Sequence, residues 1–162
     1  MIGETYKFTF SDYFPKDDML LFVFVSTGLK DIEKVVCYSP SDLYGARYYT
    51  LGFGDLEVDF ETEKFLMNDR VESNNGDTNK VLYTVISTIR PFFEIHPDAY
   101  LRIVGSNDQR SRIYVGLIAR HIRHIEPEYF VEGVCEGARE KFDIGKRYEY
   151  IIISLKKDNY EN

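Results

Sequence analysis

The stretch Tyr100-Leu-Arg-Ile-Val-Gly-Ser-Asn-Asp-Gln-Arg-Ser-Arg-Ile-Tyr114 decides how this chain is expected to fold. Residues 100–104 are mostly apolar and predict a short strand. The Gly-Ser-Asn corner that follows is typical of a tight turn, and a helix with arginines in its first turns is predicted to leave it. A strand that passes directly into a helix predicts a sheet with helices packed on it.

Other apolar stretches predict the remaining strands of this sheet. Residues 19–27 form a continuous apolar run of strand length, which indicates a central strand buried on both faces. The tight connection after Gly28 joins it to alternating residues 32–38 and predicts a β-hairpin. Further strands are predicted at residues 6–10, 46–53, 129–134 and 148–155, with a bend or bulge at Gly52 and Gly54 and a short helix or loop at 136–146.

A long helix is predicted at residues 79–95, where apolar side chains recur on one stripe. Asp77 or Thr78 can cap its first amides, and Pro91 is expected to kink or end it. With the helix after the corner, this predicts an α+β fold: a largely antiparallel sheet with two main helices packed on it. A single domain is expected to span residues 1–162, with a polar tail from about 156.

Composition restricts the classes of partner. The chain has 162 residues, a formal net charge of -7 and a pI near 5.0, so it has no long-range attraction to nucleic acid or anionic membranes. Cys37 and Cys135 show no ligand-like spacing and are expected to be reduced thiols. The apolar run 19–25 is too short to cross a membrane, and we expect a soluble cytoplasmic protein without a cofactor.

The Gly-Ser-Asn corner is the main candidate site, as a place to bind an anion. Gly105 permits close backbone approach, Ser106 and Asn107 can cap the helix or donate to a ligand, and Arg110 and Arg112 can grip a phosphate or carboxylate. The corner is neither a Walker loop nor a dinucleotide fingerprint. The alternative is a capped helix whose arginines bond to nearby acids and carbonyls.

The helix pattern separates the two arginines. Arg112 belongs to an outward arginine face, whereas Arg110 points toward the inward edge and needs a partner. The loop containing Asn74, Asn75 and Asp77 has two open interpretations: a loop with a helix cap, or the lining of a pocket beside the corner.

Acidic residues occupy every second position of residues 55–63. As a strand, this segment would have one acidic and one apolar face, typical of a solvated edge; a cation site and a surface for a basic partner are the alternatives. His121 and His124 are predicted to be partly exposed polar residues. No metal site is predicted, because zinc needs three or four ligands.

Several motifs together resemble a bacterial family known only as a domain of unknown function. They are Tyr49-Thr-Leu-Gly-Phe-Gly-Asp55, Ser73-Asn-Asn-Gly-Asp77 with Lys80-Val-Leu-Tyr-Thr-Val85, the Gly105 to Tyr114 corner, and a closing strand at 148–155. The family usually has Thr where this chain has Asn107 and Ser111, and both changes keep small polar groups. The resemblance implies a single-domain bacterial protein and implies no activity.

Three function hypotheses remain open. The first is a binding module with a phosphate or carboxylate site at the corner. The second is a protein-interaction component, antitoxin-like or immunity-like, that uses the acidic strand and exposed tyrosines. The third is an enzyme acting on nucleotides or nucleic acid. A small anionic ligand or a protein partner is therefore expected ahead of nucleic acid, and no membrane partner is expected.

Overall fold

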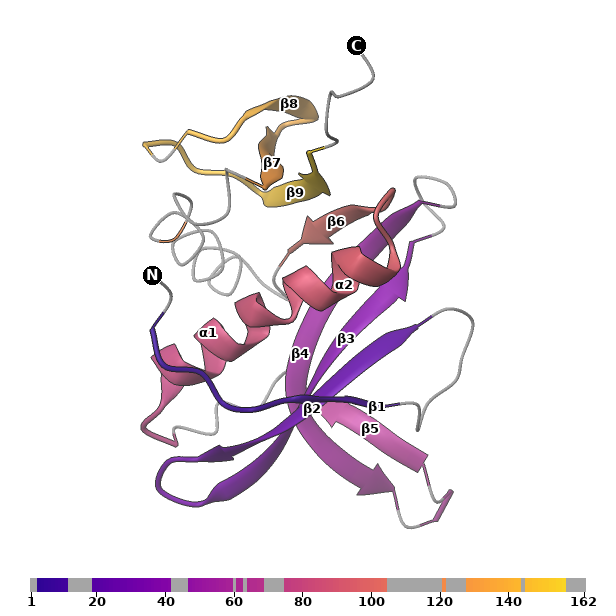
Figure 1. The fold of residues 1–162 in the computed structure, drawn as a ribbon, viewed down its shortest axis with the longest axis vertical. Helices are drawn as coiled ribbons and strands as arrows, with labels where there is room; N and C mark the ends of the chain where they lie inside the picture. Colours follow the sequence, from indigo (N-terminus) through magenta and orange to yellow (C-terminus); the bar gives the residue numbers. More distant parts are fainter. Residues whose placement is uncertain are drawn as a thin grey trace.

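The computed structural model describes residues 3–11, 19–41, 47–59, 61–62, 64–68, 75–104, 121, 128–143 and 145–156. In chain order its elements are β1 (Thr9–Ser11), β2 (Leu20–Thr27), β3 (Asp31–Pro40), β4 (Tyr48–Asp59), β5 (Lys64–Asn68), α1 (Thr78–Ser87), α2 (Ile89–Ile95), β6 (Tyr100–Ile103), β7 (Tyr129–Cys135), β8 (Ala138–Lys141) and β9 (Tyr150–Leu155). Figure 1 shows one sheet with the two helices against it.

The strands form a 9-stranded sheet in the order β1-β2-β3-β4-β6-β9-β7-β8, and β5 pairs with β4 beside this path. All of these pairs are antiparallel except β4 with β6. A parallel pair needs a crossover connection, and α1 and α2 lie in that connection. The α+β prediction with a largely antiparallel sheet is confirmed.

The predicted hairpin at the N-terminal side is confirmed. β2 pairs with β3 from Leu20↔Tyr38 to Thr27↔Asp31. The first three residues of β2 are buried, and burial then alternates, so only the first half of this strand is covered on both faces.

β4 is longer than predicted and runs through both glycines. Its register with β3 is continuous from Asp55 to Tyr49, so no bulge interrupts this pairing. In Figure 1 the strand instead curves as it passes from the β6 side of the sheet to the β5 side.

The predicted long helix is present, and Thr88 separates it into α1 and α2. Pro91 explains the division, because a proline has no N–H for the carbonyl four residues earlier and its ring crowds that carbonyl, here that of Ser87. The kink predicted at Pro91 is therefore displaced by about one helical turn toward the N-terminus.

The main core lies between the helices and one face of the sheet. Tyr38 of β3 and Phe92 of α2 are both fully buried and stack with ring centroids 4.4 Å apart. Leu101, Ile151 and Ile153 are fully buried on the same face of the sheet. Each such side chain contributes about 1.5–3 kcal/mol through burial.

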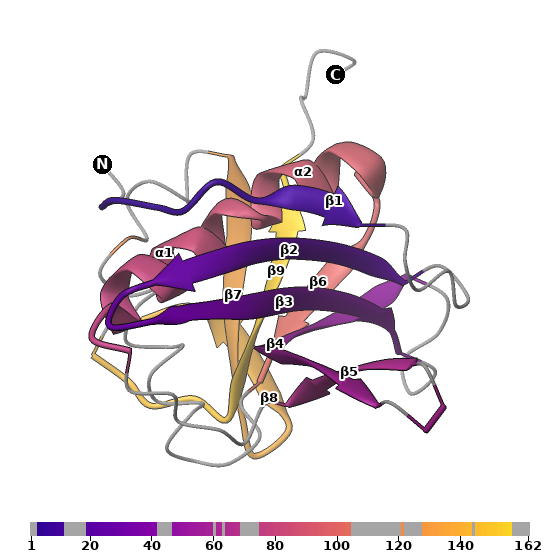
Figure 2. The same ribbon diagram turned by 90° about the horizontal axis from the view of Figure 1, so that it is seen from below.

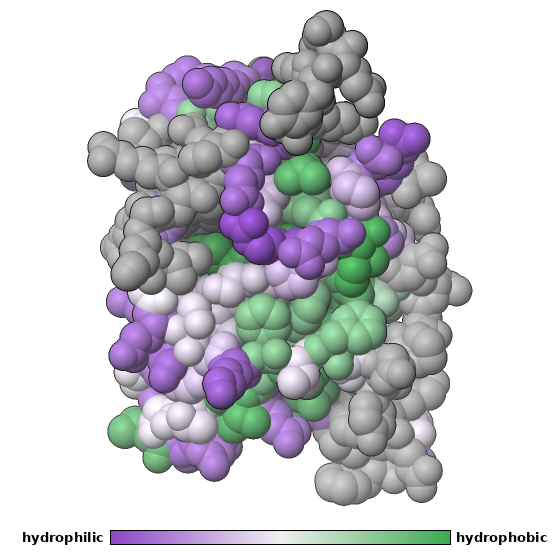
Figure 3. Space-filling view, in the orientation of Figure 1, coloured by the Kyte–Doolittle hydropathy of each residue, from purple (hydrophilic) through white to green (hydrophobic). Residues whose placement is uncertain are grey.

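The sheet twists strongly along its strand order. Figure 2 shows β2 and β3 running across the view, while β6, β7 and β9 run nearly at right angles to them. Figure 3 shows apolar side chains gathered around β1 and hydrophilic ones toward β7 and β8. Phe10 of β1 is 57% exposed, and every residue of β8 is exposed. The twist gives the β6-β9-β7-β8 half an outer face of its own.

The prediction of a short helix or loop at 136–146 is wrong at residues 138–141, which form a strand. β8 occupies Ala138–Lys141 and pairs with β7. Glu136 and Gly137 form the turn with φ of 52° and 80°, as a two-residue hairpin turn of the primed type requires. Tertiary pairing with β7 outweighs the good helix propensity of Ala-Arg-Glu-Lys.

Two strand predictions need smaller corrections. The strand predicted at residues 6–10 forms only at Thr9–Ser11, and the one predicted from residue 148 begins at Tyr150. The helix predicted after the corner lies outside the described residues, except for His121. In the described part of the chain, no helix is long and apolar enough to cross a membrane.

Candidate functional site

Most of the predicted anion site lies outside the described residues. This applies to Gly105, Ser106, Asn107, Arg110 and Arg112. The structure describes the chain up to the residue before the corner: β6 ends at Ile103, and Val104 follows it. The corner therefore stays a prediction about residues that directly follow a central strand.

Asn75 is described, whereas Asn74 is not, and the Asn75 side chain is engaged by the β2–β3 turn. Only 3% of Asn75 is exposed. Its Nδ2 donates to the Ser26 hydroxyl at 2.9 Å and to the Lys30 carbonyl at 2.6 Å, and its Oδ1 accepts from the Lys30 amide at 2.9 Å. The amide group of Asn75 thus ties the loop before α1 to the hairpin.

Asp77 directly precedes α1, as predicted for a cap, but its side chain makes no capping hydrogen bond. Its Oδ2 instead accepts from the Tyr6 hydroxyl at 2.5 Å and from the Ser26 hydroxyl. Burial raises the pKa of Asp77, but these two hydrogen bonds, together with a backbone hydrogen bond and the charge of Lys34, outweigh this effect, so the pKa lies below its ordinary value. Asp77 therefore joins three segments as a carboxylate, while the pocket-lining role of this loop stays a prediction.

The acidic segment is not one continuous strand. β4 ends at Asp59, and β5 begins at Lys64 as its antiparallel partner. Asp55 is only 9% exposed and forms an ion pair with Lys34, which is 6% exposed. The predicted solvated acidic face is therefore wrong at Asp55, because a buried charge requires a partner of opposite sign.

His121 is also more buried than predicted, with 8% of its surface exposed. Its ring meets the Tyr83 ring of α1 edge-to-face, with centroids 4.8 Å apart. His124 lies outside the described residues. Within the residues that are described, no group of three or more His, Cys, Asp or Glu side chains is placed to hold a metal ion.

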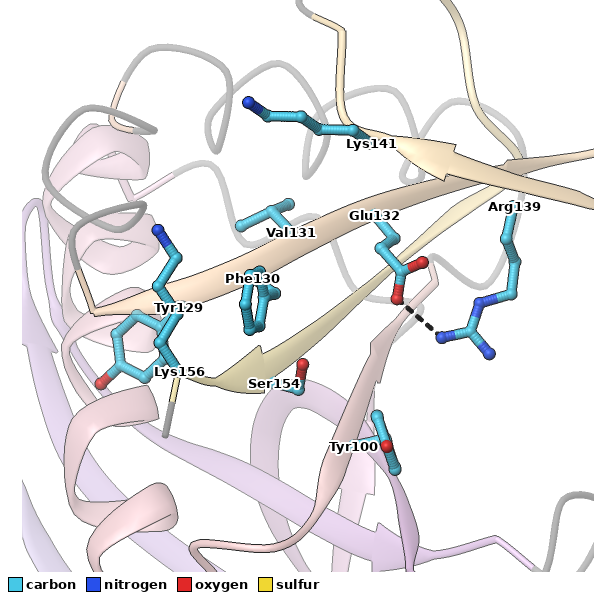
Figure 4. Close-up of a pocket in the computed structure, with 9 residues that line it drawn as sticks. All are labelled: Tyr100, Tyr129, Phe130, Val131, Glu132, Arg139, Lys141, Ser154 and Lys156. Atoms are coloured by element: carbon cyan, nitrogen blue, oxygen red, sulfur yellow. Dashed lines mark hydrogen bonds and ion pairs between the residues drawn. The ribbon is translucent and has the colours of Figure 1, made fainter. Parts of the chain in front are cut away.

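A cleft of about 600 Å³ lies on the face of the sheet opposite the helices (Figure 4). Three side chains point into it: those of Tyr100, Ser154 and Phe130. Each is adjacent in sequence to a core residue, as Tyr100 is to Leu101 and Ser154 is to Ile153, and adjacent side chains of a strand take opposite faces of the sheet. We call it the outer cleft; its lining consists of Tyr100, Tyr129, Phe130, Val131, Glu132, Arg139, Lys141, Ser154 and Lys156.

Strand register places a row of side chains across the floor of the outer cleft. Tyr48 of β4 lies beside Tyr100, Tyr100 beside Ser154, and Ser154 beside Phe130. The rings of Tyr48 and Tyr100 stack with centroids 5.1 Å apart and planes 22° apart. The row therefore has a supported aromatic ring on one side of Ser154 and the ring of Phe130 on the other.

Arg139 forms one wall of the outer cleft. Its guanidinium donates to Glu132 at 2.7 Å and to the Tyr48 hydroxyl at 3.1 Å. The hydrogen bond to Glu132 raises the pKa of Arg139 above its ordinary value, so the guanidinium stays charged. Because Arg139 comes from β8 and Tyr48 from β4, this contact links two strands that are not neighbours in the sheet.

Lys141 and Lys156 contribute two further positive charges. Lys141 lies beside Glu132 in the β7–β8 register, and Lys156 Nζ lies 5.3 Å from the centroid of the Phe130 ring. No carboxylate in the described part of the chain forms an ion pair with either lysine. The outer cleft thus has three cationic side chains and one carboxylate.

Sequence reasoning missed this cleft almost entirely. Tyr100 was part of the stretch that predicts the corner, but as a strand residue and not as a site residue. The available signal was the spacing of Arg139 and Lys141, which share one face only if residues 138–141 form a strand. Since that segment was expected to be a helix or loop, its two charges were not linked to Phe130.

Comparison with known proteins identifies a family but no activity. A family model described as a family of unknown function (DUF6934) matches residues 4–156. Neither the curated proteins nor the solved structures compared with this chain include a match. The resemblance seen in the sequence motifs is confirmed at the level of a family of unknown function.

Proposed function

The chain belongs to the DUF6934 family, whose function is unknown, and we propose that it is a small binding module that holds an anionic ligand in the outer cleft. The observation that carries this proposal is the convergence of Arg139, Lys141 and Lys156 on one cleft against the single carboxylate of Glu132. Its volume of about 600 Å³ falls within the range of small-molecule sites.

The three cations have different roles in this proposal. Arg139 is oriented by Glu132 and Tyr48, so its position is set before a ligand arrives. Lys141 and Lys156 are exposed and are not held by a described carboxylate, so they are available to a phosphate or carboxylate group. Hydrogen bonds to charged groups contribute about 1.5–3 kcal/mol each to the free energy of binding. We therefore expect a ligand with one compact anionic group that accepts such bonds from these side chains.

The corner at Gly105, Ser106 and Asn107, with Arg110 and Arg112, remains proposed as a second anion site. Its support is the sequence pattern of a strand, a polar corner and two arginines. Substitution of Arg110 tests this site more directly than substitution of Arg112, because the helix pattern predicts that Arg110 lies at the inward edge.

Isothermal titration of the full chain with inorganic phosphate, pyrophosphate and citrate tests the proposal and separates the two sites. We expect at least one of these anions to bind. The variant with Lys141→Gln and Lys156→Gln together is expected to weaken binding at least about tenfold, since it removes two charge-assisted contacts. Lys30→Gln, at the exposed β2–β3 turn, is the matched control and is expected to bind as the wild type does.

Arg110→Gln decides between the two locations. If it weakens anion binding and the double lysine variant does not, the ligand is held at the corner and the outer cleft is not the site. If none of the three anions binds, the anion-binding function is wrong at both places.

The hypothesis of a protein partner on the acidic strand has less support. Asp55 is engaged by Lys34, and the strand ends before residue 63, so the acidic face is shorter than the sequence suggested. The outer cleft, with three cationic side chains and one carboxylate, favours binding of an anion over the enzyme hypothesis.

A further inference from the structure

We propose that the outer cleft recognises a flat aromatic ring joined to the anion, as in a nucleoside monophosphate, with the ring inserted between Tyr100 and Phe130. This inference rests on the proposed anion-binding function and adds the chemical class of the ligand. It is carried by the spacing of the row across the floor of the outer cleft and by the exposure of its two aromatic ends.

The spacing of the row fits one inserted ring. Tyr100 and Phe130 lie on strands that both pair with β9, and Ser154 of β9 is the register partner of each. Neighbouring strands are about 4.8 Å apart, so the two aromatic side chains start about 9.6 Å apart. A planar ring midway between them would lie about 4.8 Å from each, within the range of aromatic pairs.

The small side chain of Ser154 leaves this position open. A large residue there would occupy the space between the two rings. Ile152, two residues earlier and on the same face of β9, is such a residue and is only 4% exposed. The Ser154 hydroxyl can both donate and accept a hydrogen bond, which matches the mixed donors and acceptors at the edge of a nucleobase.

The two aromatic rings have surface available for a ligand. Phe130 is 55% exposed and Tyr100 is 36% exposed. Tyr48 stacks on Tyr100 and so supports its ring, and the Tyr48 hydroxyl is in turn held by Arg139. Exposed large aromatics of this kind, beside polar groups, are typical of ligand sites.

The charges lie where the anionic group of such a ligand would lie. Figure 4 shows Lys156 beside Phe130 at one end of the row, Arg139 off the row beside Glu132 on the other side of the cleft, and Ser154 between the two rings. A ring above Ser154 therefore has a cation within reach in either direction. A ligand that carries a ring and a phosphate can satisfy both kinds of group at the same time.

A mononucleotide fits better than a nucleic acid strand. The contact between Arg139 and Tyr48 links β8 to β4 beside the outer cleft, whereas a nucleic acid strand needs a groove that is open at both ends. The net charge of -7 also repels a long polyanion, whereas a single phosphate meets mainly the local cations.

Titration calorimetry of the full chain with AMP, UMP, adenosine and ribose 5-phosphate tests the inference. AMP is expected to bind at least about tenfold more tightly than ribose 5-phosphate, because stacking of a base on an aromatic side chain has about this effect on affinity. Adenosine is expected to bind more weakly than AMP, since it lacks the anion.

Substitutions at Phe130 separate the ring from the anion. Phe130→Ala and Phe130→Leu are expected to weaken AMP binding about tenfold and to leave ribose 5-phosphate binding unchanged. The Leu variant keeps apolar surface, so it guards against an effect on folding. Phe10→Ala is the matched control, because Phe10 is similarly exposed at 57% but lies on β1; it is expected to bind AMP as the wild type does.

The failures of the two proposals can be told apart. If AMP and ribose 5-phosphate bind with equal affinity, or if Phe130→Leu binds AMP as the wild type does, the inference of an aromatic-ring site is wrong. The proposed anion binding is not contradicted by that result. If a short single-stranded oligonucleotide binds at least about tenfold better than AMP, the mononucleotide assignment is overturned. If none of the phosphates binds, the proposed anion function fails together with this inference.

Discussion

The backbone carbonyl oxygen of Asn75 occupies the space that the β-carbon of any residue other than glycine would need at Gly28. The same oxygen accepts a hydrogen bond from the Leu29 amide at 2.8 Å. The loop before α1 therefore closes directly on the turn of the β2–β3 hairpin. This contact, together with the side-chain bonds of Asn75, holds the start of the helix to the sheet.

Gly28→Ala is expected to destabilise the protein by about 1–3 kcal/mol, since the loop must move away from the hairpin. Urea unfolding followed by circular dichroism measures this change. Gly145→Ala is the control, because a β-carbon there meets only Asp143 at an ordinary contact distance of 3.5 Å. Equal stability of the two variants would show that the Asn75 loop is not held against Gly28.

The bond from Tyr6 to Asp77 is expected to make stability depend on pH. The pKa of Asp77 in the folded protein is below its ordinary value. The contribution of this carboxylate to the free energy of unfolding is therefore fully present above the unfolded pKa of about 3.9, and it is lost as the pH falls through the folded pKa. Tyr6→Phe removes one of the lowering hydrogen bonds. It should be less stable than the wild type at pH 7, and the difference should shrink below about pH 4.

Urea unfolding at a series of pH values between about 2 and 7 measures this effect. Tyr100→Phe, which alters no bond to Asp77, should follow the pH dependence of the wild type. A constant difference between Tyr6→Phe and the wild type at all pH values would contradict the proposed coupling to the carboxylate.

The buried pair of Lys34 and Asp55 is expected to be strongly non-additive. Lys34→Met leaves a buried carboxylate without its partner and should cost about 3–5 kcal/mol. The double variant with Asp55→Leu as well should recover most of this loss, because both charges are then absent. A double-mutant cycle by chemical denaturation checks this, and additive effects would mean that the two side chains stabilise the sheet independently.

The turn between β7 and β8 offers a stabilising substitution. Glu136 has a φ of 52°, a conformation that asparagine adopts more readily than glutamate. Glu136→Asn should therefore raise stability by about 1 kcal/mol, and Gly137→Ala, at φ of 80° with open space around it, should lower it by about 1 kcal/mol. Thermal unfolding measures both; a destabilised Glu136→Asn variant would show that the Glu136 side chain has a role beyond the turn.

Much of the architecture was predictable because it depends on local pattern. The run at residues 19–27, the turn at Gly28 and the helix with Pro91 all appear where expected. The β8 hairpin was missed because Ala138–Lys141 has helical propensity and becomes a strand only by pairing with β7. That error also concealed the outer cleft, since it separated Arg139 and Lys141 from Phe130.

The sequence by itself determined the α+β class, the first hairpin and the division of the helix, because alternation, turn glycines and the missing proline N–H act between residues a few positions apart. Only the tertiary structure decided that Tyr48, Tyr100, Ser154 and Phe130 form one row. The alternation of apolar and polar residues in the sequence predicts on which face of a strand a side chain lies, but it does not predict which strand is the neighbour. The order β4-β6-β9-β7, set by packing of the whole sheet on α1 and α2, assembles the cleft.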